Sequence, residues 1–299
     1  MKTLVNLFFS CYLLSFGSVG WAQGAAPPLI ETKVPAKSIK KKRVAKKDAK
    51  PEDILGFAGS VLLTKNNSLY DHLDSTYYDG LNYEVDLGYK WKSGNLLFRF
   101  SYDQNLRSTY EDRSDLNDGS ITYSSSAIKL DDFGEMSLTP NLTLLVPLSK
   151  KSTRVEELQT ALIVGLNLGY EPKQKLGIGN LSLGVALNIG KSFHRYDVDV
   201  NGGPISSVSS NQKLIFGYKI ESFSINLAYT HKSRWSYHTN VNEGFELSEE
   251  LDYEINKTFA IALGHTNSGA ALKSNGQDTN FAIVNENDSV IYFQGAFSF

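Results

Sequence analysis

Charged side chains recur at every second position in several short segments of this chain. In the segment from Leu81 to Trp91, Glu84, Asp86 and Lys90 alternate with apolar residues. Successive side chains of a β-strand point to opposite faces, so these charges would share one face of a strand. Such a face needs water or a partner, because a dry interior cannot hold charged groups unpaired. The pattern therefore indicates a wet wall that could contact ions or polar solutes.

If such strands close into a barrel, the same alternation predicts charged residues that face its lumen. Acidic residues are in excess among them, and this excess is concentrated between residues 244 and 255. The predicted lumen-lining residues are Glu84, Asp86, Lys90, Arg99, Asp103, Lys213, Lys219, Glu246, Glu250, Asp252 and Glu254. Small residues at equivalent positions predict space along another wall; they are Ala161, Gly165, Gly169, Gly184, Ala186 and Gly190. We expect either an open lumen with a weak preference for cations or a closed lumen in which opposite charges pair.

A second arrangement could be catalytic. His231-Lys-Ser233 resembles the His-x-Ser pair of lipid-facing outer-membrane hydrolases, the phospholipase A and lipid A deacylase families, and His231 and Ser233 would share one face of a strand. Those families follow the serine with Asn, whereas Arg234 and Trp235 follow here. We expect His231, Arg234 and Trp235 at the outer membrane interface and no enzyme activity. The sequence predicts no metal, cofactor or nucleic-acid site.

Twelve segments of about ten alternating residues could position these side chains, and that length crosses a bilayer when a strand is tilted. The predicted strands are 54–64, 81–91, 95–104, 119–130, 135–148, 158–170, 181–193, 211–220, 223–235, 244–255, 258–267 and 289–299. Short and long connections alternate between them, as periplasmic turns and external loops do in outer-membrane barrels. The fold class is therefore all-β, a transmembrane antiparallel up-and-down β-barrel of about twelve strands. Without the segment 119–130, a ten-strand barrel is the alternative.

The N-terminal region differs from the rest of the chain. Residues 1–22 combine Lys2 with a short apolar run and a small-residue site at Ala22, which predicts a secretory signal peptide. A lipoprotein signal using Cys11, the only cysteine, is the less favoured alternative. Residues 23–53 are rich in Lys and Pro and predict a disordered periplasmic extension, either a solvated linker or a segment attracted to anionic lipids or wall polymers. Residues 54–299 form the predicted barrel.

The last ten residues carry a resemblance to a known class. Phe293, Phe297 and the terminal Phe299 share one face, which resembles the closing-strand signature by which the barrel assembly machinery recognises bacterial outer-membrane β-barrel, porin-like proteins. The resemblance is to the class and covers residues 54–299. It implies location in the bacterial outer membrane, contact with outer-membrane lipid and the assembly machinery, and these three residues as the assembly signal.

Taken together, these features predict a passive pore for small hydrophilic or cationic solutes. Two alternatives come from other classes. One is a surface structural or adhesion barrel that acts through polar external loops such as 70–80, 104–119 and 265–287. The other is the lipid-facing acyl hydrolase considered above.

Overall fold

The computed structural model describes residues 56–69, 78–106, 114–130, 135–272, 278–285 and 288–299. The predicted signal peptide and basic extension lie outside the described residues, as do much of the predicted loops 70–80 and 104–119. Nothing in the described part of the chain is a helix long and apolar enough to cross a membrane. One short π-helix, η1 (Lys151–Val155), lies in the connection after residue 146.

Twelve main strands run through the described residues, and their positions follow the predicted alternation closely. In chain order they are β1 (Gly56–Ser68), β2 (Asp79–Trp91), β3 (Gly94–Asn105), β5 (Gly119–Ser125), β7 (Met136–Val146), β8 (Leu158–Tyr170), β9 (Asn180–His194), β10 (Ser206–Ile220), β11 (Phe223–Ser236), β12 (Val241–Glu254), β13 (Phe259–Ala270) and β14 (Val290–Ser298). Two strands of two residues each, β4 (Asp115–Leu116) and β6 (Ile128–Lys129), pair beside β3 and β7.

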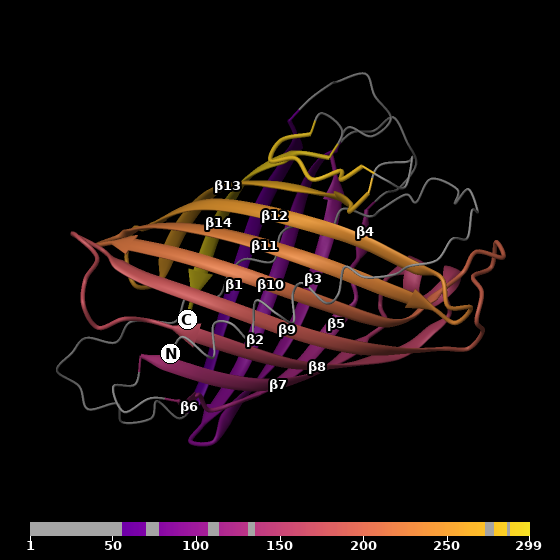
Figure 1. Cartoon of the computed structure of the whole chain (residues 1–299), viewed down its shortest axis with the longest axis horizontal. Coiled ribbons are helices and arrows are strands. Elements are labelled where there is room, and N and C mark those ends of the chain that lie inside the picture. The colour runs from indigo at the N-terminus through magenta and orange to yellow at the C-terminus, as the bar shows by residue number, and fades with distance from the viewer. Residues whose placement is uncertain (1–55, 70–77, 107–113, 131–134, 273–277, 286–287) are drawn as a thin grey trace. The chain divides into compact units, whose positions relative to one another are not determined.

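The sheet closes on itself, so the twelve-strand prediction is confirmed. Each main strand pairs antiparallel with its neighbours in the chain, and β1 pairs with both β2 and β14. Val61, for example, lies opposite Val85 on one side and Phe297 on the other. In Figure 1 the strands β8 to β12 form the near wall, and β1 to β3 lie behind them. A closed barrel satisfies every strand edge, which a sheet in lipid requires.

One predicted strand is divided. The segment 119–130 forms β5 and then, after Ser126 and Ala127, the two-residue strand β6. Both pair with β7, and the last β5 pair joins Ser124 to Asn141. The next β7 residue is Pro140, which has no N–H to donate to a ladder. Ser126 instead donates its backbone N–H to the carbonyl of Ser93, 2.9 Å away.

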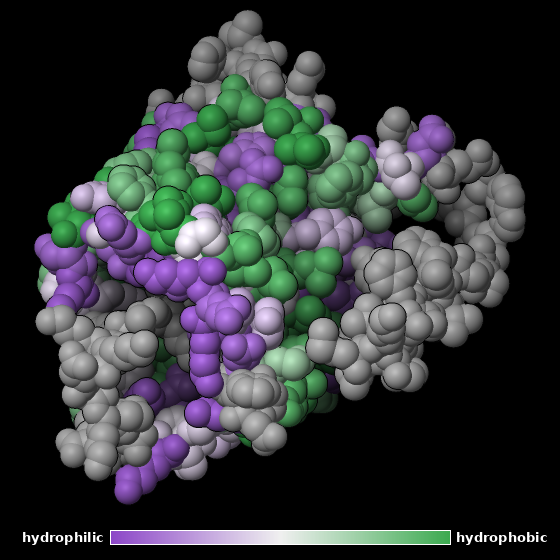
Figure 2. Space-filling view, turned by 60° about the vertical axis from the view of Figure 1, so that its left-hand side comes forward, coloured by the Kyte–Doolittle hydropathy of each residue, from purple (hydrophilic) through white to green (hydrophobic). Residues whose placement is uncertain are grey.

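Along the strands, apolar side chains are exposed and polar side chains are buried, which is the reverse of the arrangement in a soluble protein. On β2, Val85 and Leu87 are exposed, while Asn82 and Asp86 are only 4% and 5% exposed. The outward side chains of the other strands are also mainly apolar, and Figure 2 shows apolar residues gathered over the outer wall. Lipid is the solvent that makes this arrangement favourable, because it solvates apolar side chains but not polar ones.

The connections differ in length between the two ends of the barrel. Strands β2 and β3 are joined by residues 92–93, β10 and β11 by 221–222, and β12 and β13 by 255–258. These turns lie at the end where β1 begins and β14 finishes, and longer connections such as 195–205 and 271–289 lie at the other end. Short turns mark the periplasmic end of an outer-membrane barrel. The inner wall between the two ends is therefore the surface that a solute crossing the barrel would meet.

Candidate functional site: the inner wall of the barrel

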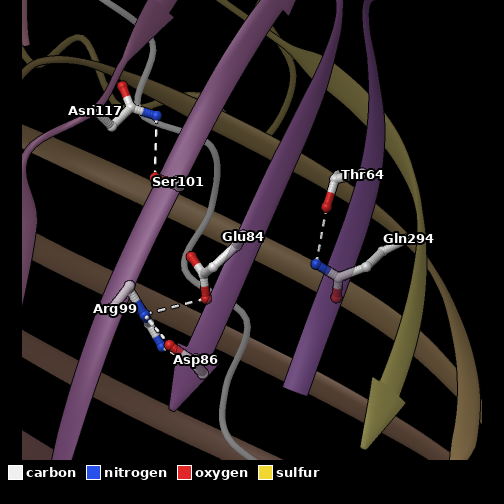
Figure 3. A network of polar contacts seen from close by, with 7 residues as sticks. All are labelled: Thr64, Glu84, Asp86, Arg99, Ser101, Asn117 and Gln294. Atoms are coloured by element: carbon white, nitrogen blue, oxygen red, sulfur yellow. Dashed lines mark hydrogen bonds and ion pairs between the residues drawn. The ribbon is translucent and has the colours of Figure 1, made fainter. Parts of the chain in front are cut away.

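Arg99 organises the charged side chains that β2 and β3 place on the inner wall. Its guanidinium binds both carboxylate oxygens of Asp86, at 2.8 and 3.1 Å, and its Nε lies 3.1 Å from an oxygen of Glu84 (Figure 3). Asp86 and Arg99 face each other across the β2–β3 ladder, so the pairing register brings them together. A two-pronged contact of this kind is among the stronger ion pairs because the fork of the guanidinium matches the carboxylate. This cluster neutralises much of the local charge.

Asp103 is held by neutral donors. Asn82 donates to one carboxylate oxygen at 2.7 Å, and Asn117 donates to the other at 2.9 Å. Asn117 also donates to the Ser101 hydroxyl, as Figure 3 shows. Burial and the nearby Asp103 carboxylate raise the pKa of Tyr78, the residue before β2, to about 12. Asp103 therefore lies in a polar pocket of amides and a neutral phenol.

A second group of charges lies on β10, β11 and β12. Lys219 is 2.8 Å from Glu254, and Lys232 is 2.6 Å from Glu246. Between these two ion pairs along β12 lie the remaining inward carboxylates of that strand, Glu250 and Asp252, which are both largely buried.

Neutral donors also reach these two carboxylates. The Tyr292 hydroxyl donates to Glu250 at 2.8 Å, and the Ser224 hydroxyl donates to Asp252 at 3.1 Å. The side-chain amide of Asn226 also donates to Asp252. β12 therefore places four carboxyl side chains along the inner wall, at positions 246, 250, 252 and 254.

The opposite part of the inner wall is uncharged. Strands β5, β7 and β8 contain no charged residue, and β9 contains only Lys191 and the histidine His194. Inward positions here are mainly hydroxyls, amides and small residues, with Ile163 of β8 among them, and the Thr122 and Thr143 hydroxyls are 2.9 Å apart. The small residues that the sequence places on this wall lie on β8 and β9, at positions 161, 165, 169, 184, 186 and 190.

The structure groups the predicted lumen-lining residues unevenly. Glu84, Asp86 and Arg99 form one cluster, and Lys219 joins Glu254. Lys90 is exposed near the periplasmic end of β2. Lys213 forms no hydrogen bond or ion pair with any residue that the structure describes. That the predicted residues line a pore is a proposal.

Several inner-wall residues were absent from the predicted set. Lys232 pairs with Glu246, and Tyr292 with Glu250. Gln294 donates to the Thr64 hydroxyl at 2.9 Å across β14 and β1 (Figure 3). Continuing the alternation through β11 and β14 would have placed Lys232, Tyr292 and Gln294 inward, because each lies an even number of residues from a buried position. Their specific partners depend on strand register, which alternation does not give.

The His-x-Ser segment lies on β11. By alternation, His231, Ser233 and Tyr229 share the face of this strand that points out of the barrel. Within the part of the chain that the structure describes, no hydrogen bond joins His231 to Ser233. Trp235 is exposed on the same face near the external end of the strand. Nor do the described residues include a group of three or more His, Cys, Asp or Glu side chains that could hold a metal ion.

The three C-terminal phenylalanines of the predicted assembly signal are all exposed on the outside of the barrel. The rings of Phe297 and Phe299 lie 6.2 Å apart, and aromatic residues of neighbouring strands, such as Phe57 and Tyr89, lie near the same end. Rings at this level suit the interface between lipid and water. Their role as a signal for assembly stays a prediction.

Comparison with known proteins supports the fold. No protein-family model matches the chain, and no curated protein matches it. Among solved structures, the COG4313 outer membrane channel from Pseudomonas putida F1 matches with a TM-score of 0.54 and 13% identity, covering 86% of this chain and 100% of that chain. The fold is that of a porin-like outer-membrane β-barrel. The NanC porin matches with a TM-score of 0.49 and 13% identity, over 80% of this chain and 98% of that one. The KdgM porin in complex with disordered oligogalacturonate matches with a TM-score of 0.46 and 10% identity, over 81% and 99%.

This porin-like barrel belongs in the bacterial outer membrane. Its outward side chains form an apolar belt bounded by aromatic residues, and its sheet has no open edge. Closed barrels with an apolar outer belt, short turns at one end and longer loops at the other are the spanning structures of that membrane. The resemblance inferred from the C-terminal strand is thereby confirmed at the level of the class.

Proposed function

We propose that this barrel is a passive pore for small hydrophilic solutes, with a weak preference for cations. The observation that carries the proposal is the inner wall. It carries charged, hydroxyl and amide side chains together with small apolar ones such as Ala161 and Ala262, and β12 places four carboxylates inward between Glu246 and Glu254, with Ser248 among them. A row of carboxylates that faces water lowers the energy of a passing cation and raises that of an anion.

Two further features support a pore. Twelve strands exceed the roughly eight whose interior is filled by side chains alone, so a barrel of this size can enclose water. The similar structure from Pseudomonas putida F1 is named an outer membrane channel. The predicted lumen-lining residues would then contact the solutes that cross.

The test is single-channel conductance of the refolded protein in a planar bilayer, with a salt gradient to read selectivity. We expect steady conductance with a cation preference. Replacing three carboxylates by their amides, Glu250→Gln, Asp252→Asn and Glu254→Gln, should abolish that preference because the row loses most of its charge. Thr143→Val on the uncharged wall is the matched control and should leave selectivity unchanged. A folded, heat-modifiable barrel without conductance would contradict the proposal.

We also propose that the barrel is not an acyl hydrolase. The absence of a hydrogen bond between His231 and Ser233 among the described residues supports this, because a general base must reach its nucleophile. Acyl release from phospholipid vesicles by the refolded barrel is the measurement. Release that disappears in His231→Ala and in Ser233→Ala would overturn this part of the proposal.

A further inference from the structure

Four asparagine side chains share one region of the inner wall, here called the amide patch. They are Asn141 on β7, Asn167 on β8, Asn188 on β9 and Asn211 on β10. Asn141 and Asn188 are the two register partners of Gly165 on β8. Asn211 lies opposite Asn188, and on its other side opposite Lys232, which binds the inward carboxylate of Glu246. Register partners point to the same face, and Asn167 is two residues from Gly165, so all four side chains face the lumen.

The amides of this patch have no partner in the part of the chain that the structure describes. None of the four forms a hydrogen bond with any residue in the described ranges. They differ in this from Asn82, Asn117 and Asn226, whose amides donate to inner-wall carboxylates. Asn167 is exposed, and the other three side chains are half-buried. A primary amide has two N–H donors and one carbonyl acceptor, and these need water or a solute when the protein offers no partner.

Gly165 brings two of these amides together. A methyl group at position 165 would overlap the amide oxygens of both Asn141 and Asn188. Both amides therefore lie over the glycine, where any larger residue would displace them. Strands β7 and β8 contain no charged residue, so the centre of the patch is neutral as well as polar. The result is a group of neighbouring donors and acceptors that a solute in the lumen would meet.

We infer that the amide patch binds small neutral solutes with several neighbouring hydroxyl groups, namely monosaccharides and polyols. A hydroxyl both donates and accepts, so two adjacent hydroxyls can use the N–H and the carbonyl of one amide together. An ether can only accept, and a charged solute gains no ion pair from an amide. This inference rests on the proposed function, because it assumes that solutes enter the lumen. It narrows these solutes from hydrophilic molecules in general to neutral polyhydroxylated ones.

The experiment measures how added solutes reduce the ion conductance of the refolded barrel in a planar bilayer. Glucose is the neutral polyhydroxylated probe, tetraethylene glycol the neutral ether of similar size and gluconate the acidic analogue. We expect glucose to reduce the conductance with saturation and tetraethylene glycol to reduce it without saturation. The glucose concentration for half the effect should rise about two- to tenfold in Asn188→Leu and in Asn141→Leu, the effect of losing one hydrogen bond.

A second variant and a control accompany these two substitutions. Asn167→Ala changes an exposed side chain, so its folding should be unaffected, and we expect a rise of about twofold in the same concentration. Ser137→Ala is the matched control on the inner face of β7, opposite Gly169 and toward the periplasmic end, and it should leave that concentration unchanged. Heat-modifiable gel mobility shows that each variant is folded.

The possible results separate the inference from the proposed function. Steady conductance that glucose reduces no more than tetraethylene glycol does would overturn the site and leave the pore standing. A saturable glucose effect that is the same in all three asparagine variants would place sugar binding elsewhere and overturn the assignment to this patch. A stronger effect of gluconate than of glucose would indicate an anion site at Lys213, two residues along β10 from Asn211, and overturn the neutral class. No conductance from a folded barrel would contradict the pore itself, and the inference would fall with it.

Discussion

The two halves of the inner wall differ in the charge of their side chains and in how these side chains contact one another. On β2, β3, β10, β11 and β12, cations and neutral donors from the neighbouring strand or the next but one bind the carboxylates, so ion pairs and hydrogen bonds link the side chains laterally. Strands β13 and β14 belong to this half because Tyr292 of β14, which lies against Gly264 of β13, donates to Glu250 of β12. On β5, β7, β8 and β9, hydroxyls, amides and small residues leave the wall uncharged. The charged half is therefore cross-linked by ion pairs, whereas the uncharged half has none.

If the barrel is a pore as proposed, this difference would let it be both stable and permeable. The printed ion pairs join adjacent strands or, for Lys219 and Glu254, strands separated by one other, so these pairs do not reach across the lumen. The electric field in the lumen would then come from the charged half alone, and the uncharged half would set the width of the lumen. Changes on the charged half should alter stability and selectivity together, whereas equivalent changes on the uncharged half should alter neither strongly.

The largest expected effect comes from removing Arg99. Arg99→Met removes the guanidinium that binds the carboxylates of Glu84 and Asp86, and Asp86 is only 5% exposed. We expect a loss of about 2 to 3 kcal/mol in the free energy of unfolding, less than for a fully buried pair because the Arg99 and Glu84 side chains stay partly exposed. Urea unfolding of the refolded barrel, followed by its heat-modifiable gel mobility, measures this. Adding Glu84→Gln and Asp86→Asn should restore most of the loss. Unchanged stability in Arg99→Met would mean that the charged half is not cross-linked as described.

A matched pair of glycine substitutions compares the two halves directly. A methyl group on Gly264 of β13 would overlap the ring of Tyr292, whose hydroxyl donates to Glu250, whereas the nearest atom to a methyl group on Gly184 of β9 would be Ile215 Cβ at 3.4 Å. We expect Gly264→Ala to cost about 1 to 3 kcal/mol through overpacking. Gly184→Ala should change stability by no more than about 0.5 kcal/mol. The same urea titration applies, and equal losses in the two variants would contradict the contrast.

The sequence predicted the barrel well because lipid enforces alternation over every strand. The segment 81–91 shows why: each outward residue faces lipid and each inward one faces water, so periodicity alone defines the strand and its faces. The divided strand β5 could not be predicted from its own residues, since the interruption coincides with Pro140 on the neighbouring strand. Alternation locates inward positions, but it does not choose partners. Lys213 and Lys232 look alike in the sequence, and only register and side-chain geometry give Lys232 a carboxylate and leave Lys213 without one among the described residues.

The smallest expected change in the free energy of unfolding comes from a substitution on the uncharged half. Thr122 and Thr143 share a hydrogen bond of 2.9 Å between their hydroxyls, and Thr143→Val removes one partner while keeping the shape of the side chain. We expect a loss of about 0.5 to 1 kcal/mol, because water in the lumen can replace the missing hydroxyl. Tyr292→Phe on the charged half removes a donor to a carboxylate and should cost more, about 1.5 to 3 kcal/mol, since hydrogen bonds to charged groups are stronger. If the two variants lost the same stability, the charge on the wall would not be what distinguishes its two halves, and packing alone would have to explain the difference.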